Sequence, residues 1–347
     1  MKRELIYQVA IFFIFFGLIL FSGCIEQTGK AKVVSTTIQS STAKPATTIL
    51  AQTTAPPTTT TSPPTTMPAP TSNKLRFAYL SREYAIQIKS VQSSEENVSK
   101  YSIVGGEIPL VYYGTVDGVH LGYQEAPHAT AQVAREAFYA YEKTGSKENL
   151  SRALFLVDHL LNNTVDRGDY MVWEYAFPWP GYSLEKGWRG SLCQAGILKA
   201  LMLAYKYTGE ERYRLASQKA LNAFSVPLDE GGLLKLREGY YWYPEYVTEA
   251  PPYVLNGFAT SLIWIKEYHE ATKNPLAERL FNEGVSSLIH FLPTYDLDKG
   301  SYYDTMGHIA SPHYHSIHIY QMKTLFEMTG DPIFQEYQLK WNASSQR

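Results

Sequence analysis

The sequence predicts a mainly α-helical fold in which αα-hairpins build an (α/α) toroid of about four hairpins. An amphipathic helix, a Thr-Gly-like turn and a second helix recur four times along the chain, and long segments rich in Gly, Pro and aromatic residues join the copies. One hairpin cannot bury its own apolar stripe, so neighbouring hairpins must stack, either as an open solenoid or as a closed ring. We expect closure, because the copies are few and the joining segments have the composition of a pocket rim.

The first 24 residues predict an export signal that tethers the chain. The stretch from Leu5 to Gly23 carries no charge and follows Lys2 and Arg3. Small residues directly before Cys24 indicate a lipoprotein processing site, which would place a lipid on Cys24. The alternative is that the segment remains as an uncleaved signal anchor. Both alternatives place the protein at the extracytoplasmic face of the cell membrane.

Residues 25–73 predict a disordered stalk, because Thr, Pro, Ser and Ala dominate and too little apolar surface is available to offset the entropy of ordering. The stalk is either O-glycosylated or a plain spacer. Residues 74–347 form the α/α-toroid domain, with a β-rich cap expected over 74–125 and helical hairpins over 126–347.

Charge and cysteine content exclude two classes of protein. The 31 basic and 33 acidic residues lack the basic excess of a nucleic-acid binder. The two cysteines, Cys24 and Cys193, give no disulfide framework.

Each hairpin turns at a threonine, and the spacing of these threonines is nearly regular. They are Thr144, Thr208, Thr272 and Thr329, separated by 64, 64 and 57 residues. Gly145, Gly209 and Gly330 follow three of them and can adopt the left-handed conformation that ends a helix. We expect Asn274 to serve in the third copy.

Three loop segments concentrate the aromatic residues. They lie at about 165–186, 226–254 and 293–312 and contain, among others, EGYYWYPEYVTEAPPY and GSYYDTMGHIASPHYHSIH. Aromatic rings pack against the apolar C–H faces of sugars, while hydroxyls and carboxylates bind sugar hydroxyls. Loops of this kind predict a carbohydrate site, although part of the aromatic set is expected to anchor the loops in the core.

The motifs in these loops resemble a known family. In order, they are Gly187-Trp188 with Gln194, then WYPEY at 242–246, VLNGFATSLI from Val254, LPTYD from Leu292, Tyr302-Tyr303-Asp304, and Tyr314-His315 with His318. Their order and spacing resemble the C-terminal domain of the D-glucuronyl C5-epimerases over about 184–341. The resemblance implies removal of the C5 proton from a glucuronate unit of an acidic polysaccharide and return of a proton to the opposite face, which gives iduronate.

The resemblance also implies the roles of individual residues. Glu245 and Tyr314 match the two proton-transfer groups, and Tyr246 and Tyr303 match tyrosines that lie close to the substrate carboxylate. Acid and base must flank the ring, because one group cannot invert a centre that it contacts from one side. The remaining candidate substrate-binding residues are Trp188, Arg189, Gln194, Trp242, Asn256, Asp304, His313, His315 and His318. The resemblance further suggests a homodimer.

The sequence departs from the family three residues after Tyr303. The family carries an arginine there, which pairs with the substrate carboxylate, whereas this chain has Met306. Arg189 and Arg237 are candidate replacements.

Four histidines, His308, His313, His315 and His318, lie close together in the sequence. Imidazole is a good zinc ligand, but no Cys or Glu motif completes a site. We therefore expect no metal and no cofactor, with His315 and His318 holding the loop of Tyr314 and His313 near the substrate.

Three other functions remain open. A polysaccharide lyase begins with the same proton abstraction. An inverting glycoside hydrolase would pair Glu245 with Asp304 or Glu174, with the two carboxylates about 6.5–9.5 Å apart. A non-catalytic glycan-binding lipoprotein needs the aromatic residues but has no reason to bring Glu245 and Tyr314 to one cleft.

Overall fold

The computed structural model describes residues 101–102 and 108–344, all of which belong to one structural unit. The predicted anchor with Cys24 and the predicted stalk lie outside the described residues. No helix in the described part of the chain is long and apolar enough to cross a membrane.

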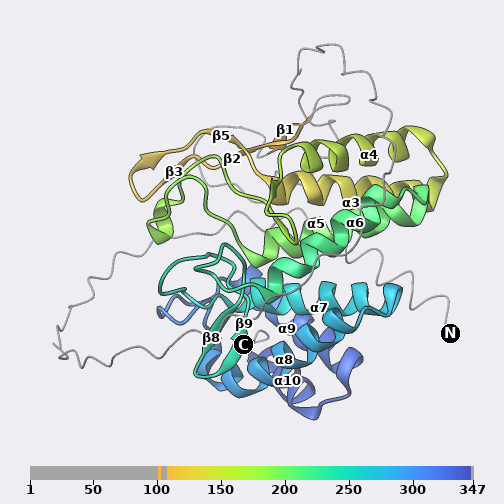
Figure 1. The fold of residues 1–347 in the computed structure, drawn as a ribbon. Helices are drawn as coiled ribbons and strands as arrows, with labels where there is room; N and C mark the ends of the chain where they lie inside the picture. The colour runs from red at the N-terminus through yellow and green to blue at the C-terminus, as the bar shows by residue number, and fades with distance from the viewer. Residues whose placement is uncertain (1–100, 103–107, 345–347) are drawn as a thin grey trace, which may run out of the picture. The chain divides into compact units, whose positions relative to one another are not determined.

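Eight helices form four consecutive αα-hairpins (Figure 1). They are α3 (Pro127–Thr144), α4 (Lys147–Asn162), α5 (Ser191–Thr208), α6 (Glu211–Asn222), α7 (Leu255–Thr272), α8 (Pro275–Phe291), α9 (Pro312–Thr329) and α10 (Pro332–Ser344). The first helix of each hairpin packs on the first helix of the next, in the order α3, α5, α7, α9. Within the described residues α3 and α9 are not a closely packed pair, so these inner helices form an arc of the toroid. The predicted fold class is confirmed, but the expected closure is not, because among the described helices α3 and α9 do not pack closely on each other.

The turn threonines explain the sequence repeat. In each hairpin the threonine hydroxyl donates a 2.7 Å hydrogen bond to the carbonyl four residues earlier. The same oxygen accepts the backbone N–H two residues later, at 3.1–3.3 Å. Each hydroxyl therefore satisfies one carbonyl at the end of the inner helix and one N–H before the outer helix, where helix termini leave such groups unpaired.

The third turn differs from the prediction. Lys273, with φ of 57°, occupies the left-handed position that glycine occupies in the other turns, and its N–H contacts the His269 carbonyl. Asn274 instead caps α8, because its side-chain oxygen accepts the N–H groups of Leu276 and Ala277. The expectation that Asn274 ends the inner helix was wrong by one position, because Asn is also a preferred N-cap residue.

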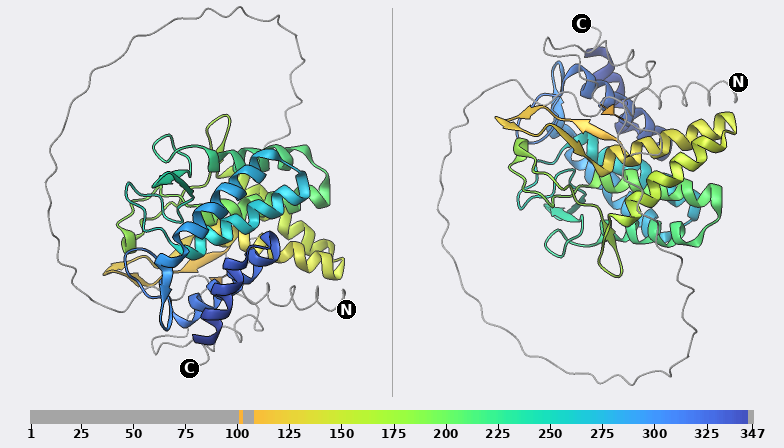
Figure 2. Two further views of the ribbon diagram at one scale, coloured as in Figure 1. Left: turned by 90° about the horizontal axis from the view of Figure 1, so that it is seen from below. Right: turned by 90° about the horizontal axis from the view of Figure 1, so that it is seen from above.

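Short strands lie at the end of the helices opposite the threonine turns (Figures 1 and 2). The strands are β1 (Tyr101–Ser102), β2 (Leu110–Tyr112), β3 (Thr115–Val116), β4 (Val119–His120), β5 (Tyr123–Glu125), β6 (Val165–Asp166), β7 (Met171–Val172), β8 (Lys235–Arg237), β9 (Tyr240–Trp242), β10 (Asp296–Leu297) and β11 (Gly300–Ser301). The first five make a β1-β2-β5 sheet and a β3-β4 hairpin, and each rim loop carries one further hairpin. All pairings between these named strands are antiparallel. Every inner helix therefore begins at the loop end.

Candidate active site

Two extended segments fix the backbone of Glu245 above the start of α5. The Ser191 N–H donates to the Pro244 carbonyl at 2.9 Å, and the Val247 N–H donates to the Arg189 carbonyl at 3.2 Å. Gly190 makes this approach possible, because a Cβ at that position would lie 1.7 Å from the Glu245 carbonyl oxygen.

The side chain of Glu245 reaches the first turn of α7. A Cβ added to Gly257 would lie 2.2 Å from Oε2 of Glu245, so only glycine leaves room for this carboxylate. The residue is 9% exposed, and Oε2 has no hydrogen-bond partner among the described residues. Burial raises the pKa of Glu245 to about 8, and the charge of Asp304 adds to the rise, while contacts with Tyr246 and the Gly257 backbone oppose it. Such a carboxyl group changes charge near neutral pH, as a general base requires.

Tyr246 lies in a cluster of aromatic rings beside Glu245. Its ring centroid is 5.6 Å from that of Trp188, 4.6 Å from that of Tyr182 and 6.4 Å from that of Trp179. The Tyr182 hydroxyl in turn donates to Asp304 at 2.8 Å. Of the predicted residues, Trp188 therefore lies directly beside Tyr246, and Tyr246 is connected to Asp304 through Tyr182, which the sequence did not single out.

Tyr303 and Tyr314 complete the cluster. Their ring centroids lie 4.7 Å apart in an edge-to-face arrangement, with an interplanar angle of 63°. The Tyr303 carbonyl accepts the N–H of Leu255, which attaches this loop to the start of α7. Burial raises the pKa of Tyr303, and the neighbouring Glu245, Tyr246, Tyr314 and Tyr182 raise it further. The structure therefore brings Glu245, Tyr246, Tyr303 and Tyr314 to one place.

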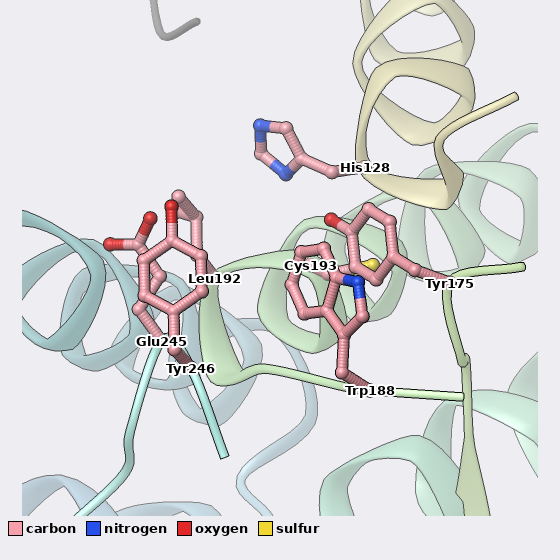
Figure 3. A pocket seen from close by; sticks show the side chains of 7 residues that line it. All are labelled: His128, Tyr175, Trp188, Leu192, Cys193, Glu245 and Tyr246. Carbon is pink, nitrogen blue, oxygen red and sulfur yellow. The ribbon is translucent and has the colours of Figure 1, made fainter. Parts of the chain in front are cut away.

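A small pocket opens between α3, α5 and the segment of Glu245 (Figure 3). It is lined by His128, Tyr175, Trp188, Leu192, Cys193, Glu245 and Tyr246. Tyr175 stacks on Trp188 at a centroid distance of 3.7 Å. Burial raises the pKa of Cys193 to about 12, so its thiol stays protonated and is no nucleophile.

Sequence reasoning missed His128, although the repeat contained a signal for it. The inner helices α3 and α9 both begin Pro-His and both have 18 residues, so His128 occupies the same position as His313. In α5 and α7 that second position is Leu192 and Asn256. Asn256 and His313 were among the predicted substrate-binding residues, whereas His128 and Leu192 were not.

Asp304 is buried and its oxygens are occupied. They accept the Tyr182 hydroxyl, the backbone N–H groups of Met306 and His308, and the His308 ring at 2.7 Å. Asp304 thus organises its loop and holds a charge near Glu245. Met306 is 64% exposed.

The two candidate replacements for the arginine make other contacts. Arg189 donates to the carbonyls of Gly232 and Leu228. Arg237 lies over the rings of Phe291 and Tyr253, at 3.7 and 4.5 Å. Both guanidinium groups therefore stabilise the rim loops.

Several other predicted residues support the site from outside the pocket. Gln194 donates to the carbonyls of Met171 and Ala220, and Trp242 stacks on Phe258 in the core. His315 and His318 both contact the Ser301 hydroxyl, which joins the start of α9 to β11. His313 lies beside Tyr314, at a centroid distance of 5.5 Å. Within the described residues, no three His, Cys, Asp or Glu side chains gather in an arrangement that could hold a metal ion.

Comparison with known proteins gives the family. Residues 166–343 match the family model described as the D-glucuronyl C5-epimerase C-terminus. An uncharacterised protein of Methanocaldococcus jannaschii is 44% identical over 264 residues, covering 71% of this chain and 86% of that protein. The D-glucuronyl C5-epimerase of Caenorhabditis elegans is 30% identical over 283 residues, covering 76% of this chain but 44% of that enzyme, less than half of its length.

Among solved structures, a sugar epimerase from a ruminal bacterium aligns with a TM-score of 0.47 and 16% identity, covering 76% of this chain and 69% of that one. The family match spans half of the chain and includes the segments that carry Glu245, Tyr246, Tyr303 and Tyr314. The chain therefore belongs to the D-glucuronyl C5-epimerase C-terminus family.

Proposed function

We propose that this protein epimerises D-glucuronate units of an acidic polysaccharide to L-iduronate at C5. The observation that carries the proposal is the meeting of Glu245 with Tyr246, Tyr303 and Tyr314 in one buried cluster, within a chain of this family. A binding module would need the aromatic rings but not a buried carboxyl group whose pKa is raised to about 8.

In the proposed reaction Glu245 acts as the base. Its carboxylate takes the C5 proton, and the electron pair of the broken C–H bond delocalises onto the substrate carboxylate. The hydroxyls of Tyr246 and Tyr303 donate hydrogen bonds to that group, whose negative charge grows as the proton leaves. Tyr314 then gives its phenolic proton to the opposite face of C5. Exchange with solvent restores the proton on Tyr314 and removes the one on Glu245.

The hydrolase alternative finds less support. Asp304, one of its two candidate partners for Glu245, has its oxygens occupied by Tyr182, His308 and two backbone N–H groups. A general acid or base must instead reach the scissile bond or the attacking water.

The test is incubation of the full-length chain in heavy water with unsulfated glucuronate polymer, followed by NMR. Deuterium at C5 together with iduronate signals is the expected result, and Glu245→Gln should abolish both. An unsaturated chain end would instead establish a lyase. Absence of exchange on every uronate polymer tested would contradict the proposal.

We also propose that the domain works at the extracytoplasmic face of the membrane, tethered through residues 1–24. The support is the uncharged segment before Cys24 and the Thr/Pro/Ser-rich stretch after it. Mass spectrometry of membrane-extracted protein should find a lipid on Cys24, and Cys24→Ser should remove it. A membrane-bound chain with an unmodified Cys24 would favour the uncleaved anchor.

A further inference from the structure

The loop after Tyr303 brings an imidazole to the edge of the site. Tyr303 donates its backbone N–H to the His308 carbonyl at 2.7 Å, which closes a turn over the residues between them. Gly307, with φ of 92°, allows this turn, because residues with a Cβ rarely adopt such a conformation. His308 therefore lies beside Tyr303, although the sequence suggested no substrate contact for it.

A buried carboxylate holds the ring of His308. Oδ1 of Asp304 accepts the backbone N–H groups of Met306 and His308. Oδ2 accepts the Tyr182 hydroxyl at 2.8 Å and lies 2.7 Å from Nδ1 of His308. Because an ionised carboxylate can only accept hydrogen bonds, Nδ1 carries the hydrogen in this contact. The contact is retained when Nε2 takes up a second proton.

The rest of the ring can reach solvent at the edge of the aromatic cluster. The His308 side chain is 40% exposed, whereas that of Asp304 is fully buried. Within the described residues, Nε2 of His308 makes no hydrogen bond. The Tyr182 ring lies between His308 and the site, with its centroid 6.3 Å from that of His308 and 4.6 Å from that of Tyr246.

His308 can supply a positive charge at this place. The guanidinium groups of Arg189 and Arg237 are held by carbonyls and rings of the rim loops. A carboxylate has no proton to donate to an unprotonated Nε2, but it accepts the N–H of a protonated ring. Histidine is the side chain that changes charge near neutral pH. A carboxylate that binds here therefore draws a proton onto Nε2.

We propose that His308 is a specificity-determining residue, whose Nε2 takes up a proton from solvent and donates it in a hydrogen bond to a carboxylate of the polysaccharide. This carboxylate belongs to a uronate unit other than the one that reacts at Glu245. In the proposed reaction Tyr246 and Tyr303 bind the carboxylate of the reacting unit, and His308 lies beyond Tyr182 from Tyr246. The choice of an acidic polysaccharide rests on the function proposed above.

Other titratable groups surround His308. Asp304 and Tyr182 contact it directly. From the β3–β4 hairpin, a carboxylate oxygen of Asp117 lies 3.9 Å from the Cβ position of Gly181, the residue before Tyr182. Each of these groups remains in place in the variants below, so a change in proton uptake can be assigned to the imidazole.

Glu245 needs separate treatment, because it can also take up a proton when an acidic polymer binds. Its pKa is raised to about 8 by burial and by the charge of Asp304. Binding is therefore measured in the full-length Glu245→Gln chain, in which residue 245 cannot titrate and the proposed reaction does not occur.

The test is titration calorimetry with unsulfated glucuronate polymer, in buffers of different ionisation enthalpy. In Glu245→Gln, binding should take up protons from the buffer and should tighten about fivefold as pH falls from 8 to 6. Adding His308→Gln should remove both effects, because Gln keeps a polar side chain that does not titrate. Adding His290→Gln is the matched control and should keep both effects, because His290 is an exposed histidine that stacks on Tyr240 in another hairpin.

A short oligosaccharide with a single glucuronate identifies the unit that His308 contacts. At saturating concentration it should bind without proton uptake, because it has no second carboxylate to reach Nε2. Equal uptake with this oligosaccharide and with the polymer would overturn the assignment to another uronate unit.

Nitrogen-15 NMR reads the charge of the ring directly. In Glu245→Gln at pH 8, the free chain should show His308 protonated at Nδ1 alone, and addition of the polymer should protonate Nε2. A ring that stays neutral while calorimetry shows binding, or proton uptake that persists in His308→Gln, would overturn the inference.

The two proposals can fail separately. If wild type catalyses exchange but His308→Gln binds the polymer with the proton uptake of the His290→Gln control, only the role of His308 is lost. If wild type binds the polymer without exchange, the epimerase proposal fails. Calorimetry and the ring signals of His308 then still test the carboxylate contact, since neither depends on turnover.

Discussion

The surroundings of Glu245 have opposing effects on its pKa, and the resulting value is one at which the carboxyl group can act as a base. Burial and Asp304 disfavour its charge, while Tyr246 and the Gly257 backbone favour it, and the pKa settles at about 8. Since the carboxylate is the active form, exchange at C5 should increase as pH rises from 6 and level off above about 8. Glu245→Gln should lower the exchange rate by at least about 100-fold at every pH.

The control for this prediction is Glu283→Gln, which changes an exposed carboxylate on α8. It should keep both the rate and the pH profile of wild type. A wild-type profile that is flat between pH 6 and 9 would show that Glu245 does not titrate in the reaction.

Tyr314 offers a sharper distinction between the two faces of the sugar. In Tyr314→Phe, Glu245 can still remove the C5 proton and return deuterium to the same face. Deuterium should therefore still appear in glucuronate, while iduronate formation falls by about 100-fold or more. NMR resolves the two products. Equal loss of exchange and inversion would mean that Tyr314 is also needed to stabilise the intermediate.

At the scale of elements, the site is built where helices begin. All four inner helices have 18 residues and start at the loop end, so their first turns lie at equivalent places. The third position is Cys193 in α5, Gly257 in α7 and Tyr314 in α9. The same position of the repeat thus has three uses: Cys193 lines the pocket, Gly257 leaves space for the Glu245 side chain, and Tyr314 is the proposed proton donor.

Gly257→Ala tests this arrangement. The added methyl group would collide with the Glu245 carboxylate, so exchange should fall by about tenfold or more as the base is displaced. Gly284→Ala is the matched control, because its added Cβ would lie equally close, 2.2 Å, to a Leu262 methyl group in the core. Both variants should lose about 1–3 kcal/mol of stability from overpacking. Only Gly257→Ala should change kcat, and a rate loss of equal size in both would argue against a specific role.

The repeat was predictable from sequence because its signals are local. A threonine with glycine after it specifies a helix end from a few neighbouring residues, and the structure confirms this pattern in three turns. Asn274 was misassigned because Asn suits both the end of one helix and the start of the next. The close approach of Glu245 to Gly257 depends on packing between segments far apart in the chain, which no local pattern contains.

At the scale of the whole molecule, the fold class followed from counting hairpins, and the family motifs indicated the residues that are proposed to transfer protons. His128 could not be found in this way. It comes from the hairpin without distinctive motifs, and it meets Glu245 only because α3 packs on α5. The positions of Arg189 and Arg237 were equally inaccessible, since their partners are backbone carbonyls and aromatic rings of remote loops.

The buried ionisable groups make a prediction for the stability of the whole domain. The pKa of Glu245 is raised from 4.5 to about 8, so its contribution to stability is complete below pH 4.5 and is lost as pH rises toward 8. The pKa values of His128 and His318 are lowered from 6.5 to about 3, so their contribution is complete above pH 6.5 and is lost as pH falls toward 3. Between pH 4.5 and 6.5 the stability gained from the two histidines as pH rises exceeds the stability lost at Glu245. Above pH 6.5 only the ionisation of Glu245 still changes the stability.

The free energy of unfolding should therefore be greatest near pH 6.5 and decline on both sides, with a slope of about 1 kcal/mol per pH unit for each group. Denaturant titrations from pH 4 to 9 measure this curve. In Glu245→Gln the decline between pH 6.5 and 8 should disappear, while the rise between pH 4.5 and 6.5 should become roughly twice as steep, because the two histidines then act without the opposing glutamate. If the variant keeps the alkaline decline, another group is responsible for it, and the carboxyl group of Glu245 ionises in the folded protein as readily as in the unfolded chain.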